Sequence, residues 1–151
     1  MNERAKHILC AVDFSLASDA VIRYAAETLA RDSELSVLFI APEAEKEEGL
    51  GAMHLHEFSR YSDILAQHKV TVRFAVRYGE PAAGILDFAA EHGASMIILG
   101  SHGSRAIGRL LVGGTAESVM RRATCPVVIL KMPENSVKAE SAPLCHEILQ
   151  D

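Results

Sequence analysis

The stretch MIILGSHGSRAIGRLLVGGTAESVMRRATCPVVILK, residues 96–131, decides the fold class of this protein. It begins with a continuous apolar run, breaks into glycines, crosses a basic loop, and continues as a helical pattern that leads into a second apolar run. Continuous apolar runs are typical of strands that are buried on both faces, as in a parallel sheet. The stretch therefore predicts a strand over 95–99, a helix over 115–123 and a strand over 126–131.

Strands and helices alternate through the rest of the chain as well. Compact apolar runs predict strands, and apolar residues at helical spacing predict helices between them. The predicted strands are 7–12, 35–42 and 70–76, and the predicted helices are 17–33, 56–68 and 78–93. An acidic, solvated loop is expected over 43–49. Such alternation implies an α/β three-layer sandwich, a parallel sheet with helices on both faces.

Several residues mark where the predicted helices begin and end. Ser15 or Ser18 is expected to cap the first helix, because serine side chains accept hydrogen bonds from free backbone N–H groups there. Pro81 suits the first turn of the helix over 78–93, and Gly93 suits its C-terminal stop. These signals fix the helix ends from local chemistry alone.

The chain has 151 residues, which is enough for one well-buried domain. We expect that domain over 1–132 and a flexible, polar C-terminal tail over 133–151. No apolar stretch has the length of a membrane span, and the N-terminus passes from charged residues directly into a strand without a signal-peptide pattern. The protein is therefore expected in the cytoplasm, with no membrane partner.

Charge and cysteine content exclude two further classes of protein. The formal net charge of −5 argues against general binding of nucleic acid, which depends on lysines and arginines that neutralise phosphates. Cys10, Cys125 and Cys145 are an odd number and share no CxxC spacing. We expect ordinary reduced thiols rather than a disulfide framework or a metal site.

The glycines in the opening stretch have the properties of a phosphate cradle. Ligands of open α/β sheets bind beyond the carboxyl ends of the strands, and Gly100 lies at such an end. Gly100 and Gly103 bracket a tight turn in which backbone amides can approach a ligand. Gly113 and Gly114 open a helix whose free N–H groups favour an anion. A fold-determining corner would also need glycines, and both interpretations stay open on spacing alone.

The polar residues of the same loop have two interpretations. Arg105 and Arg109 would share a face if the loop is helical and would then meet a phosphate, or they belong to a solvated basic loop. His102 lies between two motif glycines and is a candidate ligand contact rather than a general base, because no carboxylate lies near it in sequence. Neither a GxxxxGK[ST] nor a GxGxxG pattern is present, which excludes a P-loop and a dinucleotide fingerprint.

Outside this corner, Asp13 and two histidines are the polar residues that invite a function. Asp13 follows the first strand, where it would either cap the next turn or face a ligand. His54 and His56 form an HxH pattern, but residues two apart on a helix point away from each other. We therefore interpret the histidines as surface residues and keep both interpretations of Asp13.

At this point the sequence resembles a known family. GSHGSRAIGRLLVGGTAESV followed by CPVVILK looks like the universal stress protein family, whose nucleotide-binding members carry G-x2-G-x9-G-[S/T]. The resemblance extends over residues 6–131 and includes ILCAVDFSLASDAVIRYAAETLA and GEPAAGILDFAAEHGASMIILGSHG. It implies an open five-stranded parallel sheet with strand order 3-2-1-4-5. It also implies a homodimer that forms through the strand over 126–131.

The resemblance assigns roles to the motif glycines. Gly100, Gly103 and Gly113 match the glycines that in the family line the triphosphate and the ribose. The final Ser/Thr of the motif is replaced by Gly114, so a hydroxyl is missing while the backbone N–H remains. The loss would weaken binding by about 10- to 100-fold. Thr115 follows by one residue, which turns its side chain by about 100° around the helix.

The resemblance also assigns the nucleoside side of the site. Asp13 matches the aspartate that contacts the nucleoside, with Ala11 and Val12 beside it. Ile40 matches the apolar position whose backbone meets adenine.

The predicted function is therefore that of a stress-response protein that binds ATP, ADP or AMP, with or without magnesium, and regulates an unidentified protein partner. Two alternatives remain: a dimeric interaction module with a degenerate, nucleotide-free site, and a slow ATPase. Phosphoryl transfer needs a positioned metal and a group that orients water, and Asp13 is the one evident carboxylate near the site. The sequence thus favours binding over catalysis.

Overall fold

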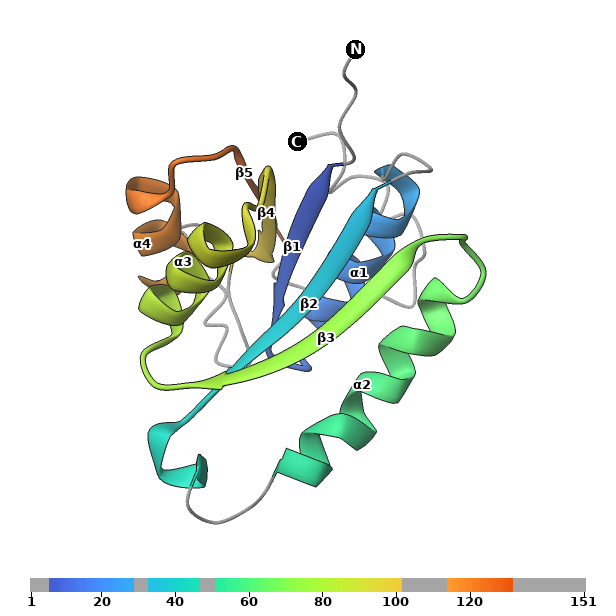
Figure 1. Cartoon of the computed structure of the whole chain (residues 1–151), viewed down its shortest axis with the longest axis horizontal. Coiled ribbons are helices and arrows are strands. Elements are labelled where there is room, and N and C mark those ends of the chain that lie inside the picture. The colour runs from blue at the N-terminus through green and yellow to red at the C-terminus, as the bar shows by residue number, and fades with distance from the viewer. Residues whose placement is uncertain (1–5, 29–32, 47–50, 102–113, 132–151) are drawn as a thin grey trace.

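The computed structural model describes residues 6–28, 33–46, 51–101 and 114–131, and Figure 1 shows how they are arranged. A five-stranded parallel sheet forms the centre, with the strand order β3-β2-β1-β4-β5. The strands are β1 (His7–Val12), β2 (Glu34–Ala41), β3 (Thr71–Tyr78), β4 (Met96–Gly100) and β5 (Val127–Leu130). This confirms the predicted α/β fold and its strand order.

Helices cover both faces of the sheet, in the three layers that the sequence predicts (Figure 1). On one face lie α1 (Leu16–Thr28) and α2 (Gly51–Leu65); on the other lie α3 (Pro81–His92) and α4 (Gly114–Arg122). A short 3₁₀ helix, η1 (Glu43–Lys46), follows β2. No helix in the described part of the chain is long and apolar enough to cross a membrane.

The core consists of two apolar clusters separated by the sheet. Successive side chains of a strand point to opposite faces, and β1 follows this rule. Ile8, Cys10 and Val12 pack under α1 and α2, whereas Leu9 packs under α3. Burial on both sides explains why β1 reads as a continuous apolar run rather than an alternating one.

The predicted ends of α3 are confirmed, and one capping group was not foreseen. Pro81 occupies the first turn, and Gly93 ends the helix in the left-handed conformation, with φ of 64°. The N-cap is Glu80, whose carboxylate accepts hydrogen bonds from the backbone N–H groups of Ala82 and Ala83. The C-terminal glycine was predictable because few other residues adopt that backbone conformation without strain.

The region after β2 differs from the prediction. The segment 43–49, expected to be a solvated loop, contains η1, and α2 begins at Gly51 rather than at 56. His54 in the first turns of α2 packs against Phe14 and pairs with Glu45 across the connection. Contacts between residues far apart in the sequence therefore stabilise this helix start. The sequence around 51–55 has no apolar periodicity that would predict it. His54 is half-buried, which corrects the surface assignment; His56 is exposed as expected.

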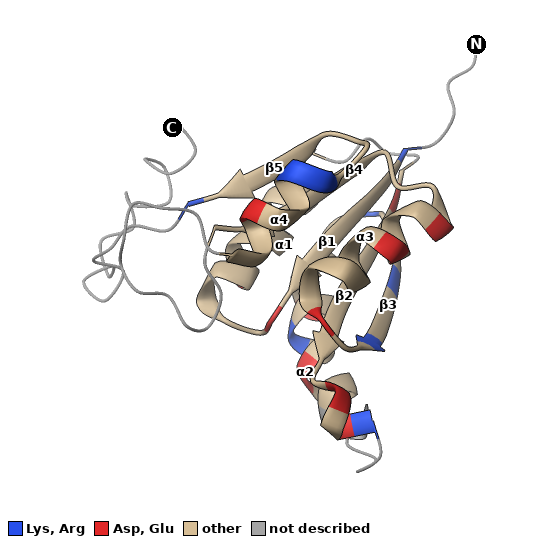
Figure 2. Ribbon diagram, turned by 90° about the vertical axis from the view of Figure 1, so that its left-hand side faces the viewer, with Lys and Arg blue, Asp and Glu red and all other residues tan. Residues whose placement is uncertain are grey.

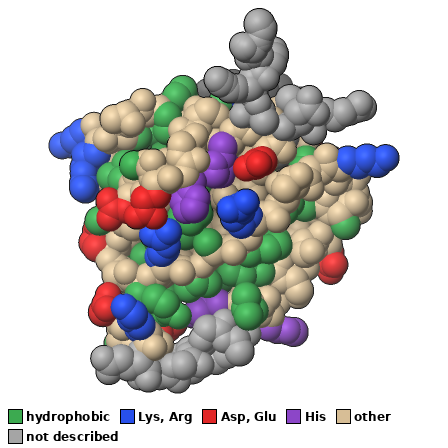
Figure 3. Space-filling model, viewed as in Figure 1, with side chains coloured by type: hydrophobic (Ala, Val, Ile, Leu, Met, Phe, Trp, Pro, Cys, Tyr) green, Lys and Arg blue, Asp and Glu red, His purple; other side chains and the backbone are tan. Residues whose placement is uncertain are grey.

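Charged side chains of both signs lie on the surface. On the face shown in Figure 3, lysine and arginine side chains are scattered among aspartate and glutamate side chains. Ion pairs form between such groups, as in Arg60 with Asp19 and Arg77 with Glu91. Figure 2 shows the basic last turn of α4, which complements the negative end of that helix dipole.

The two cysteines within the described residues have no disulfide partner, as predicted. Cys10 is fully buried on β1, and burial raises the pKa of its thiol well above the usual range. Cys125 is half-buried, and burial raises the pKa of its thiol as well. Cys145 and the predicted tail over 133–151 lie outside the described residues.

Candidate functional site

A cavity of about 130 Å³ opens at the carboxyl end of the sheet, where β1 lies between β2 and β4. The chain order reverses at this point, because β1 to β3 extend in one direction and β4 begins on the other side of β1. That arrangement is the usual ligand site of an open α/β sheet. The cavity holds more than a water, which occupies about 30 Å³, and less than a whole drug-sized ligand, which needs about 300 Å³ or more.

The cavity brings together six of the predicted site residues, which come from β1 and the turn after it, β2, β4 and α4. They are Ala11, Val12, Asp13, Ile40, Gly100 and Thr115. Gly114 opens α4 beside Thr115 but does not line the cavity. His102, Gly103, Arg105 and Gly113 lie outside the described residues, so their predicted roles stay predictions.

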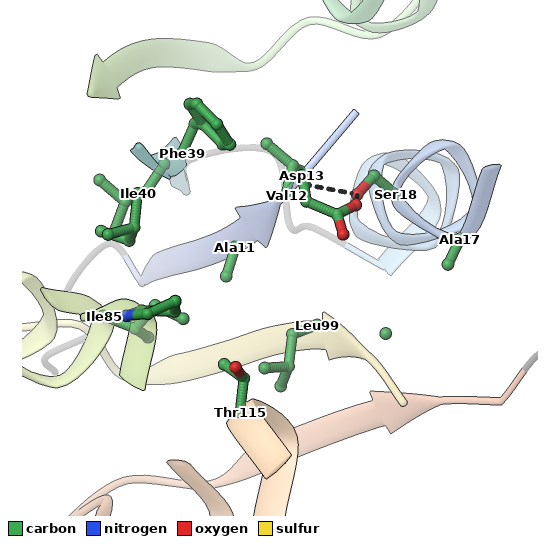
Figure 4. Close-up of a pocket in the computed structure, with 13 residues that line it drawn as sticks. Ala11, Val12, Asp13, Ala17, Ser18, Phe39, Ile40, Ile85, Leu99 and Thr115 are labelled. Atoms are coloured by element: carbon green, nitrogen blue, oxygen red, sulfur yellow. Dashed lines mark hydrogen bonds between the residues drawn. The ribbon is translucent and has the colours of Figure 1, made fainter. Parts of the chain in front are cut away.

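Asp13 is held by the residues that follow it, as Figure 4 shows. Its carboxylate Oδ1 accepts hydrogen bonds from the Ser15 backbone N–H at 3.1 Å and from the Ser18 hydroxyl at 3.0 Å. The Ser18 hydroxyl oxygen also accepts from the backbone N–H of Asp13 at 2.8 Å. Asp13 therefore fastens the turn between β1 and α1 and lines the cavity at the same time. The two interpretations of Asp13 left open above are both compatible with this geometry.

The first helix is not capped by serine as expected. Ser15 immediately precedes α1, yet its buried hydroxyl has no hydrogen-bond partner among the described residues. Ser18 lies in the first turn of α1, is only 4% exposed, and uses its hydroxyl for Asp13. The Ser18 side chain and the Ser15 backbone N–H thus hold the Asp13 carboxylate, and neither serine hydroxyl caps the helix.

One wall of the cavity is apolar and closely packed. Ile40 from the end of β2 faces Ile85 of α3 and Leu99 of β4 across the cavity (Figure 4). Phe39 also borders the cavity, but its ring packs on the other face of the sheet. Helix α3 approaches β2 at Gly84, where an added Cβ would lie 2.7 Å from Cδ1 of Ile40. A flat aromatic ring system suits such a wall, because it loses little hydrogen bonding on burial.

The first turn of α4 borders the cavity beside Leu99 (Figure 4). Thr115 projects from that turn toward the cavity (Figure 4). The first N–H groups of a helix have no partners within it and carry the positive end of the helix dipole. An anion near the start of α4 would therefore be favoured. Asp13 is the one ionisable group among the described lining residues.

An aromatic cluster lies behind the Asp13 turn, formed by Phe14, Phe39, His54, Phe58, Tyr61 and Phe74. The ring of Phe14 is at its centre, with ring centroids 4.7 Å from Phe39 and 5.4 Å from Phe58. Tyr61 is fully buried, and burial raises the pKa of its phenol to about 12. The phenol therefore stays neutral at ordinary pH and belongs to the core.

Sequence reasoning missed several residues of this cavity. Ser18, Phe39, Ile85 and Leu99 line it, yet none was singled out as a site residue. The spacing of Asp13, Ser15 and Ser18 was the available signal for the hydrogen-bond network. The apolar residues carried no such signal, because they look like any other core residue in the sequence.

The described residues contain no group of three or more His, Cys, Asp or Glu side chains that could hold a metal ion. Among the described lining residues, the Ser18 hydroxyl donates to the Asp13 carboxylate, and this pair belongs to the turn between β1 and α1. What this arrangement can do is bind a ligand that has an apolar ring, hydrogen-bond donors and an anionic group.

Comparison with known proteins places the chain among universal stress proteins. The model of the universal stress protein family matches residues 4–131. Universal stress protein MJ0531 of Methanocaldococcus jannaschii is 32% identical over 89 residues, which are 59% of this chain and 49% of that protein. The chain spans about half the length of the first two curated relatives, 49% and 52%.

Solved structures share the fold. Universal stress protein UspA from Lactobacillus plantarum superposes with a TM-score of 0.75 at 24% identity, over 85% of this chain and 99% of that chain. The universal stress protein from Archaeoglobus fulgidus in complex with dAMP superposes with a TM-score of 0.67 at 24% identity, over 82% of this chain and 96% of that chain.

Proposed function

The chain belongs to the universal stress protein family, and from this premise we propose that it binds an adenine nucleotide in the cavity beside Asp13. ATP, ADP or AMP is the proposed ligand, and its occupancy regulates the interaction with a protein partner. The bound dAMP of the Archaeoglobus fulgidus relative supports an adenine ligand. The cytoplasmic location expected from the sequence stays a prediction.

The observation that carries the proposal is the division of the cavity into two chemically different ends. The apolar wall of Ile40 and Ile85 suits a purine ring, and the first turn of α4 suits phosphate. Asp13 suits the nucleoside part rather than the phosphate, because an ionised carboxylate only accepts hydrogen bonds. Sugar hydroxyls and exocyclic amines are donors, whereas a phosphate would be repelled.

The size of the cavity is consistent with this division. The cavity of about 130 Å³ has room for part of a nucleotide, and in the proposed complex the base occupies it. Gly100 and Thr115 lie where the chain enters and leaves residues 102–113, which carry the remaining motif glycine positions Gly103 and Gly113. In the proposed complex, those residues and the start of α4 contact the phosphates.

The experiment that tests the proposal is identification of the nucleotide that copurifies with the protein. The protein is denatured, the released small molecules are separated and detected by mass, and the stripped protein is titrated with Mg-ATP. An adenine nucleotide at near-stoichiometric amount supports the proposal. A protein that is isolated empty and ignores millimolar ATP with magnesium would contradict it.

Slow ATP hydrolysis is a second candidate function, motivated by the carboxylate at the nucleoside end of the cavity. In this candidate, Asp13 would contact a magnesium ion instead of the nucleoside hydroxyls, since carboxylate oxygens are preferred magnesium ligands. A magnesium ion would supply neutralisation of phosphate charge. ATP turnover no faster than in Asp13→Ala would eliminate this candidate.

Gly114→Ser is expected to strengthen nucleotide binding by about tenfold, because a hydroxyl at the start of α4 adds a hydrogen bond to a charged group. The structure has room for the side chain: a Cβ on Gly114 has no atom within 4 Å. Titration calorimetry of both proteins with ATP measures the change. Gly114→Ala is the matched control, since it adds the Cβ without the hydroxyl.

An equal response of the two Gly114 variants would mean that the hydroxyl is not the missing element. If neither variant nor the wild-type protein binds ATP, the interaction module with a degenerate site is the better description.

We also expect a homodimer in solution through β5. Among the described strands, β5 lies at the edge of the sheet and pairs only with β4, and it carries Val127, Val128 and Ile129. An apolar edge strand with unpaired backbone groups is a site of association. Sedimentation equilibrium at micromolar concentration should therefore give the mass of a dimer. A mass of 16.3 kDa, that of the single chain, would contradict this prediction.

A further inference from the structure

We infer that Phe14 is a positioning residue, whose clamped left-handed backbone holds the Asp13 carboxylate at the cavity; this inference rests on the proposed nucleotide site. Phe14 has φ of 67° and is the one non-glycine residue with positive φ in the described part of the chain. A bulky side chain in this conformation is a genuine outlier, which persists only where its surroundings hold it. Such outliers gather at binding sites.

The left-handed residue sits at the junction that shapes the Asp13 network. Phe14 lies between Asp13, which lines the cavity, and Ser15, which immediately precedes α1. The turn at Phe14 brings the Ser15 N–H back to Oδ1 of Asp13 and brings the Ser18 hydroxyl against both the Asp13 N–H and Oδ1. All three hydrogen bonds join the chain before Phe14 to the chain after it. The conformation of Phe14 therefore sets where the carboxylate lies.

The ring of Phe14 is what keeps the backbone in this conformation. Four rings of the aromatic cluster surround it, at centroid distances of 4.7 to 6.0 Å. Tyr61 and His54 are nearly parallel to it, with interplanar angles of 15° and 9°. His54 is itself fixed, because its Nε2 lies 2.8 Å from Oε1 of Glu45. A rotation of the Phe14 backbone would pull its ring out of these contacts.

A purely structural role would give a different result from a positioning role. If Phe14 were only a core residue, its loss would lower stability in the way that the loss of any ring in the cluster does. If it positions Asp13, its loss also weakens ligand binding, and that weakening depends on Asp13. The two roles are separated by comparing affinity with stability in matched variants.

The test compares Phe14→Leu with Phe74→Leu. Phe74 belongs to the same aromatic cluster through Phe58, at 4.9 Å, and lies on β3 away from the Asp13 turn. We expect Phe14→Leu to bind ATP at least about tenfold more weakly and Phe74→Leu to bind it like the wild-type protein. Combined with Asp13→Ala, Phe14→Leu should cause no further loss, because it acts through the residue already removed.

A measurement without nucleotide tests whether Phe14 holds the Asp13 turn, whatever ligand the protein binds. Amide hydrogen exchange at Asp13 and Ser15 should quicken about tenfold in Phe14→Leu, while exchange at Cys10, in the preceding strand β1, stays unchanged. If Phe14→Leu fails to fold, His54→Ala takes its place. It removes one ring that packs on Phe14, leaves Phe14 itself unchanged, and should also quicken exchange at Asp13 and Ser15.

The outcomes separate the two proposals. If the wild-type protein binds no adenine nucleotide, the proposed function fails and the exchange rates alone decide the role of Phe14. Equal affinity in Phe14→Leu and Phe74→Leu overturns the positioning role, as does unchanged exchange at Asp13.

Discussion

Asp13→Ala is expected to weaken adenine nucleotide binding by about 10- to 100-fold, which is what a hydrogen bond to a charged group contributes. The carboxylate lines the cavity at the proposed nucleoside end, and it is the one ionisable group among the described lining residues. Its removal also leaves the Ser15 N–H and the Ser18 hydroxyl without their acceptor. Titration calorimetry with ATP measures the affinity, and thermal unfolding measures the accompanying loss of stability.

Asp19→Ala is the matched control for charge. It removes the same charge from α1, but Asp19 pairs with Arg60 rather than lining the cavity. Asp13→Asn adds a second comparison, since its amide oxygen can still accept from Ser15 while the negative charge is gone. If Asp13→Ala and Asp19→Ala bind ATP equally well, Asp13 has no ligand role and serves the turn alone.

Gly84→Val is expected to destabilise the protein by about 1–3 kcal/mol, the usual cost of overpacking a core. Helix α3 approaches β2 at Gly84, and a Cβ there would lie 2.7 Å from Cδ1 of Ile40. Ile40 must therefore move, and because it lines the cavity, nucleotide binding should weaken in the same variant. Urea denaturation and ATP titration measure the two effects.

Two further variants calibrate this result. Gly84→Ala adds only the Cβ, which a rotation of the Ile40 side chain can accommodate, and the better helix propensity of alanine offsets about 1 kcal/mol of strain. Ala90→Val places valine at an exposed position of the same helix, and it should change stability only through helix propensity. Wild-type stability and affinity in Gly84→Val would show that α3 does not depend on this close approach.

The architecture was predictable because its signals are local. The run over 7–12 is apolar at nearly every position, since β1 is buried on both faces, and the observed strand has the predicted bounds. Gly93 stops α3 because its left-handed conformation suits glycine. The start of α2 was not predictable in this way. Its first turns depend on His54, whose partners Phe14 and Glu45 come from other elements.

The candidate site was predictable in part, and for a different reason. The family resemblance gave Ala11, Val12 and Ile40, while Gly100 and Asp13 were also indicated by their positions after strands. Thr115 was considered as a substitute for the missing hydroxyl, and all six residues line one cavity. Ser18 was named only as a helix cap and Phe14 not at all, although both lie within five residues of Asp13. A serine in a helix and a phenylalanine after a strand are common residues, and their sequence positions do not reveal a hydrogen bond or a left-handed backbone.

The sequence by itself determined the alternation of strands and helices and the family of the chain. Both follow from periodicities and motifs that neighbouring residues carry. Only the tertiary structure decided which side chains surround the cavity, how Ser18 holds Asp13, and why Phe14 keeps its unusual backbone. The Ser18–Asp13 contact joins α1 to the turn after β1, whereas the cavity lining and the Phe14 backbone depend on contacts with β2, β4, α2 and α3. Such contacts arise only when residues far apart in the sequence pack together.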